Sequence, residues 1–255
     1  MLDERSGSHA ALGVARPGPL RVYAHVRAST DTAELTGLRV LLVADLLARG
    51  AELSGLQVLT TRVFSGDLAR KAAVERAAAD FGVHPPVLPA GDLAEAWPGG
   101  RTDVHVANDD GNGMDDRSGI LIRAAAARLA QDDRLGDGVA GMIGGHDAFA
   151  VRLALMSRPR HQAAELSASG LHDVAQTLGE WRHRVARWAE SPSGAIPEQI
   201  ATALQAAFGN LDTAAVLALL SGLMADETVP PGSRFETFVY ADRVLGLDLP
   251  RDIGR

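Results

Sequence analysis

The chain has 255 residues, of which 46% are hydrophobic and 22% charged, a composition typical of a globular protein with a substantial core. Its net charge of −7 argues against a large surface that follows nucleic-acid phosphates, because such surfaces need clustered Lys and Arg. The sequence has no cysteine and no run of 18 apolar residues, which excludes disulfides, thiolate chemistry and a membrane span.

Residues 1–19 are rich in Gly, Ser, Ala and Pro, which predicts a flexible N-terminal tail. The segment lacks the apolar stretch of a secretory signal. We therefore expect a cytoplasmic protein with no membrane partner.

Strands and helices alternate in the next part of the chain. The sequence predicts a strand over Leu20–Val26, a polar turn over Ala28–Gly37, a helix over Leu38–Leu53 and a second strand over Leu56–Val63. A strand, a helix and a strand in this order form a βαβ unit, which indicates a parallel sheet.

The same region continues with a predicted helix over Asp67–Phe81, a third strand over Thr102–Ala107 and an alanine-rich helix over Ile120–Ala130. The glycine-rich stretch Gly136–Gly145 predicts a hinge or a short strand with loops. Residues 20–145 thus form a predicted α/β domain.

Residues 146–255 change character and predict a bundle of helices. An apolar seam on one face indicates a long helix, and we expect its two tryptophans in the core. The seam consists of Leu171, Val174, Leu178, Trp181, Val185 and Trp188. Pro197 favours the start of a second helix, and Thr213–Ala225 predicts a third. Ser233-Arg234-Phe235-Glu236 predicts a capping box that opens the last helix.

The first strand and helix of the α/β region resemble the cysteinyl-tRNA synthetase family, class I synthetases to which the cysteine ligase of mycothiol synthesis is related. The similar segment, Val22–Arg49, reads VYAHVRASTDTAELTGLRVLLVADLLAR. Tyr23, Asp31, Asp45 and Arg49 fall in register with the family's pattern without a gap.

Later segments continue the resemblance in the same order. Thr102–Ile122 is similar to the family's Asp-Ile-His-Gly-Gly-Gly stretch and beyond, with Asp103, His105, Asp110 and Ile120 in register.

The helical region adds three further similar segments. Asp147–Ser157 resembles the segment that joins the family's catalytic and helical domains, and it retains Arg152. Asn210–Thr213 and Gly232–Leu249 are similar to later helices of that domain. The resemblance implies a Rossmann-like class I synthetase nucleotide-binding domain over 20–145, followed by an α-helical bundle domain over 146–255.

The resemblance also implies a nucleotide site, whose matching positions are Glu34, Thr36, Gly37, Asp103, His105 and Asp110. In the family two imidazoles at the start of the first helix bind the ATP phosphates, and both are absent here. Glu34 would repel a triphosphate, which leaves the helix N-terminus and the Thr36 hydroxyl as donors. The family's lysine-rich loop is missing as well, because Lys71 is the single lysine.

The family's zinc site is reduced in the same way. His25 stands at the position of the first zinc-binding cysteine, Asp115 at that of a histidine, and Gly119 at that of a glutamate. Because zinc needs a complete tetrahedral ligand set, we expect the metal site to be lost.

Two functions are consistent with these departures from the family's pattern. The first is a pseudoenzyme that keeps the fold and acts as a small-molecule-binding or regulatory module, with a small molecule or a protein as partner. The alternative is a divergent ATP-dependent aminoacyl ligase that uses ATP and Mg²⁺ and transfers the acyl group to a small amine or a carrier. We do not expect tRNA as a partner, because the chain has no basic surplus. The sequence leaves the substrate and the oligomeric state open.

Overall fold

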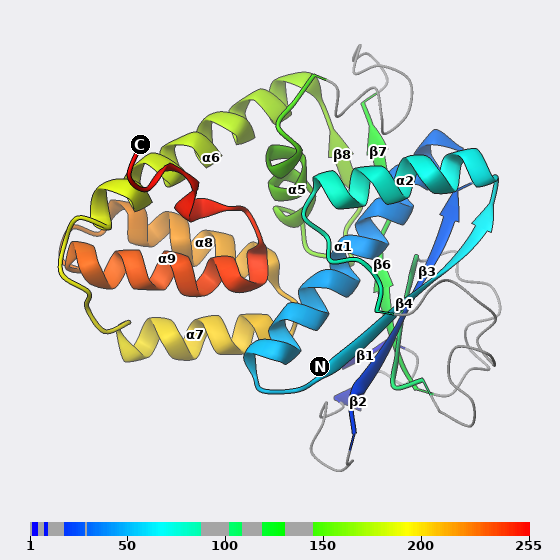
Figure 1. Cartoon of the computed structure of the whole chain (residues 1–255), viewed down its shortest axis with the longest axis horizontal. Coiled ribbons are helices and arrows are strands. Elements are labelled where there is room, and N and C mark those ends of the chain that lie inside the picture. Colours follow the sequence, from blue (N-terminus) through cyan, green and yellow to red (C-terminus); the bar gives the residue numbers. More distant parts are fainter. Residues whose placement is uncertain are drawn as a thin grey trace.

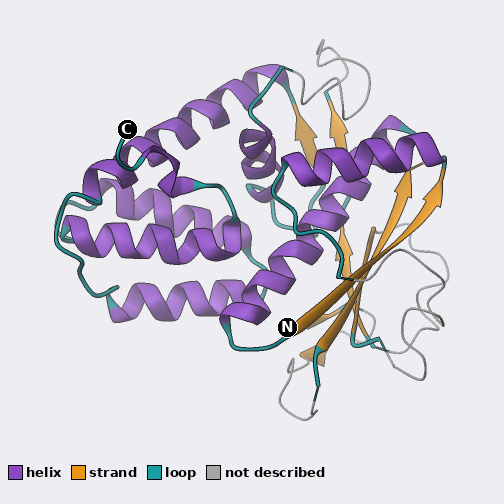
Figure 2. Cartoon of the chain, in the orientation of Figure 1, coloured by secondary structure: helices purple, strands orange, loops and turns teal. Residues whose placement is uncertain are grey.

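The computed structural model describes residues 2–4, 8–9, 18–28, 30–87, 102–108, 119–130 and 145–255. These residues form a mixed α/β fold with a four-stranded parallel sheet and seven α-helices (Figures 1 and 2). The strands are β1 (Leu2–Asp3), β2 (Ser8–His9), β3 (Leu20–Ala28), β4 (Val58–Gly66), β5 (Val104–Asn108), β6 (Ile120–Ala124), β7 (Ala127–Leu129) and β8 (Ala164–Leu166). The helices are α1 (Asp31–Leu53), α2 (Leu68–Asp80), α5 (Ala148–Met156), α6 (Ala168–Trp188), α7 (Glu198–Gly209), α8 (Thr213–Ala225), α9 (Pro231–Leu245) and the 3₁₀ helix η1 (Leu249–Asp252).

The main sheet has the strand order β4-β3-β5-β6, and every neighbouring pair is parallel. From β3 the chain passes to β4 on one side and then returns to β5 on the other, so the order reverses between β3 and β5. Val22, Ala24 and Val26 of β3 are buried on the face that α1 covers, and Tyr23 and His25 alternate with them on the opposite face. The predicted βαβ unit and parallel sheet are confirmed.

Helix α1 lies between the sheet and the helical part of the chain (Figure 1). Val40, Leu41, Leu42 and Val43 follow one another and so point to different sides of the helix, and all four are buried. A helix that is apolar on every side is a core helix, and here both of its flanks are covered.

The helical part packs around α9, which contacts α1, α6, α7 and α8, and the apolar seam of α6 faces this helix. The rings of Trp181 and Trp188 approach Phe238 of α9 edge-on, with centroids 5.6 and 5.3 Å apart. Both tryptophans are buried, which confirms the core prediction. One apolar core runs from the sheet through α1 and α5 into this bundle, and the predicted division at 145/146 falls just before Asp147, the N-cap of α5.

The first helix begins earlier than the sequence indicated. The stretch Ala28–Gly37 was predicted as a turn and the helix from Leu38, but α1 begins at Asp31. The N–H of Glu34 already donates to the Thr30 carbonyl at 2.9 Å. Polar residues of this kind are common both in turns and at helix starts, so composition alone indicated the wrong state.

The alanine-rich segment Ile120–Ala130 is not the predicted helix but forms strands β6 and β7. Leu121, Ile122 and Ala124 have no exposed surface, so the segment is covered on both faces of the sheet. Buried parallel strands carry continuous apolar runs, and this tertiary setting overrides the helix propensity of alanine.

The predicted capping box is also wrong. Helix α9 begins at Pro231, which places Ser233 inside its first turn, and Pro is favoured at this first position. The Glu236 carboxylate accepts a hydrogen bond from the Ser193 hydroxyl at 2.6 Å.

The beginning of the chain contributes structure where a flexible tail was predicted. Strands β1 and β2 pair antiparallel, and the N–H of Glu4 donates to the Leu121 carbonyl of β6 at 3.0 Å. The Asp3 carboxylate accepts the Leu121 N–H at 2.9 Å. Asp3 and Glu4 thus bond the backbone of β6, the edge strand of the main sheet. Of the predicted hinge 136–145, only Gly145 is among the described residues. Over the described residues, no helix has the length and apolar character that crossing a membrane requires.

Candidate functional site

Glu34 lies near the start of α1 and is 5% exposed. Its carboxylate pairs with the guanidinium of Arg70 from α2 at 2.8 Å, which neutralises it and joins the two helices. Because the N–H of Glu34 donates to Thr30, the backbone amides from Glu34 onward belong to the helix ladder. The helix N-terminus expected at Glu34–Gly37 therefore lies at Asp31.

The hydroxyl of Thr36 connects α1 to β7. It donates to the carbonyl oxygen of Ala127 at 3.2 Å and accepts the Ala127 N–H at 3.1 Å, and both residues are buried. The proton that the resemblance assigns to a phosphate is thus donated to the protein's own backbone.

Gly37 allows α1 to approach β3 closely. A Cβ atom at this position would lie 2.7 Å from Cγ1 of Val26 and 3.1 Å from the carbonyl oxygen of Arg27. Real Cβ atoms do not show the first of these contacts, so a larger residue at position 37 would force Val26 or α1 to shift.

Asp103 lies at the opposite end of β3 from Gly37. Its carboxylate accepts the N–H of Arg21 at 3.0 Å, whereas Gly37 lies against Arg27. Six residues of extended strand separate the two positions, about 20 Å. The structure therefore does not bring Asp103 together with the start of α1, and Asp110 lies outside the described residues.

His105 of β5 instead meets His25 of β3. The Nε2 atom of His25 lies 2.9 Å from Nδ1 of His105, and the ring centroids are 5.2 Å apart. One ring must carry the proton between these nitrogens and the other must accept it. His105 is buried, so the pair forms a polar contact within the sheet face opposite α1.

Tyr23 completes this cluster. Its ring stacks near His25 at 6.3 Å and lies 5.9 Å from His105. Burial raises the pKa of the Tyr23 phenol, and this effect exceeds the opposing hydrogen bond with Thr102 and the charge of Arg21. The phenol therefore remains a neutral hydrogen-bonding group at physiological pH.

The predicted remnants of a zinc site are only partly described. His25 lies in the histidine pair, and Asp115 falls outside the described residues. Within the described ranges, no three His, Asp or Glu side chains gather as metal ligands. The loss of zinc remains a prediction.

Three residues in register with the resemblance form a buried ionic centre. Oδ2 of Asp45 accepts from Nε of Arg49 at 2.8 Å and from a guanidinium nitrogen of Arg152 at 2.7 Å. Its Oδ1 accepts the N–H of His84 at 3.0 Å. Burial alone would raise the pKa of Asp45, but these cations and the amide hold it below its ordinary value.

Arg152 makes this centre a joint between distant elements. Its guanidinium also donates to the carbonyl of Leu245 in α9 at 2.6 Å and to that of Phe81 after α2 at 3.0 Å. The matched positions Asp45, Arg49 and Arg152 therefore serve the architecture. The ionic role was not predicted from the sequence, because the resemblance identified the three positions without indicating that their side chains contact one another.

A cavity beside this centre was missed as well. It contains Arg62 and Thr60 of β4, which showed no pattern beyond that of a strand. No protein-family model and no curated protein matches the sequence, so the resemblance depends on the residues quoted above.

Proposed function

We propose that the chain is a class I synthetase-like protein that no longer forms aminoacyl adenylates and serves as a small-molecule-binding or regulatory module. The observation that carries this proposal is the use of Thr36, whose hydroxyl is bonded to both backbone groups of Ala127. Glu34 and Gly37 support it, since one is paired with Arg70 and the other is packed against β3.

Adenylate formation needs donors around the migrating phosphates, and each is typically worth about 3 kcal/mol. Lys71, the single lysine, is the one residue able to supply an ammonium group, and its Nζ lies 5.2 Å from the Phe64 ring centroid. The loss of two imidazoles and a lysine-rich loop would lower the rate by several orders of magnitude, although such effects need not add.

The carboxyl end of β3 and β5 is the favoured place for a small ligand. Ligands of open parallel sheets bind beyond the carboxyl ends of the strands, where the strand order reverses. His25 lies three residues before the end of β3, and its hydrogen bond to His105, near the start of β5, fixes its ring as a polar contact for a ligand group.

The test of lost catalysis is ATP–pyrophosphate exchange. The whole chain is incubated with ATP, Mg²⁺ and each amino acid in turn, and we expect no exchange above background. Robust exchange with any one amino acid would overturn the proposal and support the divergent ligase.

The test of binding is calorimetry with ATP, AMP, cysteine and the other amino acids. We expect His25→Ala to weaken the binding of a ligand at least fivefold. His172→Ala on the exposed face of α6 is the control and should leave it unchanged. Failure of every ligand to bind would contradict the small-molecule function and leave a protein partner.

A further inference from the structure

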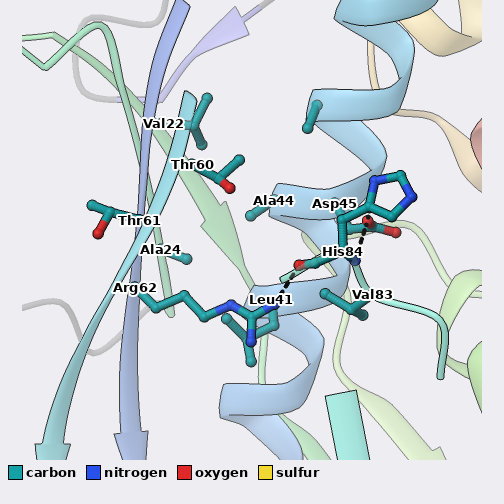
Figure 3. A pocket seen from close by; sticks show the side chains of 11 residues that line it. Val22, Ala24, Leu41, Ala44, Asp45, Thr60, Thr61, Arg62, Val83 and His84 are labelled. Atoms are coloured by element: carbon teal, nitrogen blue, oxygen red, sulfur yellow. Dashed lines mark hydrogen bonds and ion pairs between the residues drawn. The ribbon is translucent and has the colours of Figure 1, made fainter. Parts of the chain in front are cut away.

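We propose that the cavity between α1 and the amino-terminal halves of β3 and β4 binds a small carboxylate, with Arg62 as its anchor. The cavity has a volume of about 20 Å³. Figure 3 shows Thr60 and Arg62 of β4 directed toward α1, while the neighbouring Thr61 points to the other face. The site lies across the sheet from Tyr23 and His25, so it is separate from the location proposed above.

The guanidinium of Arg62 is the feature suited to hold an anionic ligand. Arg62 is only 7% exposed, and one of its terminal nitrogens donates to the His84 carbonyl at 2.5 Å. That carbonyl is its hydrogen-bond partner among the described residues. A guanidinium has five N–H donors, and those of Arg62 that the described residues leave unused are reached by solvent and so can donate to a ligand.

Burial makes an unpaired cation costly. Desolvation lowers the pKa of Arg62, and the through-space attraction of Glu75 and Asp45 opposes this effect only in part. Arginine nevertheless keeps its charge in proteins. An anion bound beside it would offset the desolvation directly.

Asp45, the carboxylate in the cavity wall, does not fill this role. Both of its oxygens already accept hydrogen bonds, with Arg49 and Arg152 on one and the His84 amide on the other. The charge of Asp45 is thus engaged by Arg49 and Arg152, and it acts on Arg62 through space, as that of Glu75 does.

A second carboxylate acts on this centre from α9. Burial raises the pKa of Asp242, although its oxygens accept the N–H groups of Leu247 and Leu249. Asp242 acts electrostatically on Arg152, so its charge is used within the ionic centre.

The size and walls of the cavity select the kind of anion. The cavity of about 20 Å³ is little larger than the space of about 10–15 Å³ that one water molecule needs. It therefore takes a group of only a few atoms and excludes phosphate or sulfate. A planar carboxylate matches the guanidinium fork and can accept two hydrogen bonds from it. Val22, Ala24 and Leu41 supply apolar walls that keep water from competing.

The rim leaves room for a substituent on the carboxylate. The side chain of His84 is 56% exposed and stands at the cavity's edge (Figure 3). The ligand class is therefore a small monocarboxylate such as formate or acetate, or a larger molecule whose carboxylate enters the cavity.

The experiment uses ¹³C-labelled formate and acetate with the whole chain, and follows line broadening in a titration by NMR. We expect saturable broadening in the native protein and at least about tenfold weaker binding in Arg62→Gln, since a charge-assisted contact is lost. Arg128→Gln is the control, because that arginine lies on the surface and pairs with Glu165. It should bind as the native protein does.

Ala44→Leu gives a second readout that keeps the cation. Ala44 lines the cavity from α1, and a leucine there fills the space without touching the charge of Arg62. We expect it to abolish broadening as well. Equal broadening in all variants would show that the carboxylate binds elsewhere, and no saturable broadening in the native protein would show that the cavity takes no carboxylate. Either result would overturn the proposal. Neither result bears on exchange activity or on binding at His25.

Discussion

Asp45 of α1 and Arg152 of α5 form an ion pair of 2.7 Å in which the side chains are 1% and 0% exposed. The pair joins segments 107 residues apart in the sequence. Because Arg152 also binds carbonyls of Phe81 and Leu245, this single guanidinium connects the α/β part of the fold to the bundle.

Replacing the carboxylate should be strongly destabilising. Asp45→Asn leaves Arg152 buried without its ion-pair partner, and we expect the free energy of unfolding to fall by about 3–5 kcal/mol. Urea denaturation followed by circular dichroism measures this loss. Asp173→Asn on the exposed face of α6 is the control and should change stability by less than about 0.5 kcal/mol. A loss below about 1 kcal/mol for Asp45→Asn would contradict the role assigned to the pair.

The same pair predicts how stability responds to acid. The pKa of Asp45 in the folded state lies below its ordinary value of 3.8, so the unfolded chain takes up its proton first as the pH falls. The contribution of Asp45 is complete above the ordinary value and is lost as the pH falls through the lower, folded-state pKa. Denaturation midpoints measured between pH 7 and pH 2 should fall less steeply in Asp45→Asn. Parallel curves would show that Asp45 is not a source of acid sensitivity.

Two glycines of the same helix should respond oppositely to alanine. Gly37→Ala forces a Cβ against Val26, and we expect a loss of about 1–3 kcal/mol from overpacking. Gly50→Ala meets open space and should stabilise α1 by about 0.5–1 kcal/mol. Thermal unfolding of the two variants and the native protein tests both signs at once. A neutral Gly37→Ala would mean that α1 can move away from β3.

Elements with a clear period could be predicted from the sequence. The strand predicted over Leu20–Val26, and observed as Leu20–Ala28, is a mostly apolar run that is buried on both faces. The helix at Thr213–Ala225 and the seam containing Trp181 and Trp188 follow from apolar spacing, because burial on one face sets that spacing. The helix predicted over Ile120–Ala130 was wrong, since pairing with β5 decides the conformation of this segment and the helix propensity of its alanines does not.

The candidate site was less predictable. The hydrogen bond between His25 and His105 joins positions 80 residues apart, and it depends on the register of two strands that no local pattern shows. Arg62 likewise gains its importance from the helix packed over it. The resemblance placed Thr36 at the phosphates, but its actual partner is a strand that was predicted as a helix.

The role of Thr36 can be separated from phosphate binding by two substitutions of similar size. Thr36→Val keeps the shape but leaves the buried N–H and carbonyl of Ala127 without their partner, which should cost about 1–3 kcal/mol. Thr36→Ser keeps the hydroxyl and should lose less than Thr36→Val. Chemical denaturation of both variants gives the difference, and hydrogen exchange of the Ala127 amide should be faster in Thr36→Val alone. If Thr36→Val were as stable as Thr36→Ser, the hydroxyl would not be needed for the fold. A hydroxyl released from Ala127 could then bind a ligand, and Thr36 would no longer support lost catalysis.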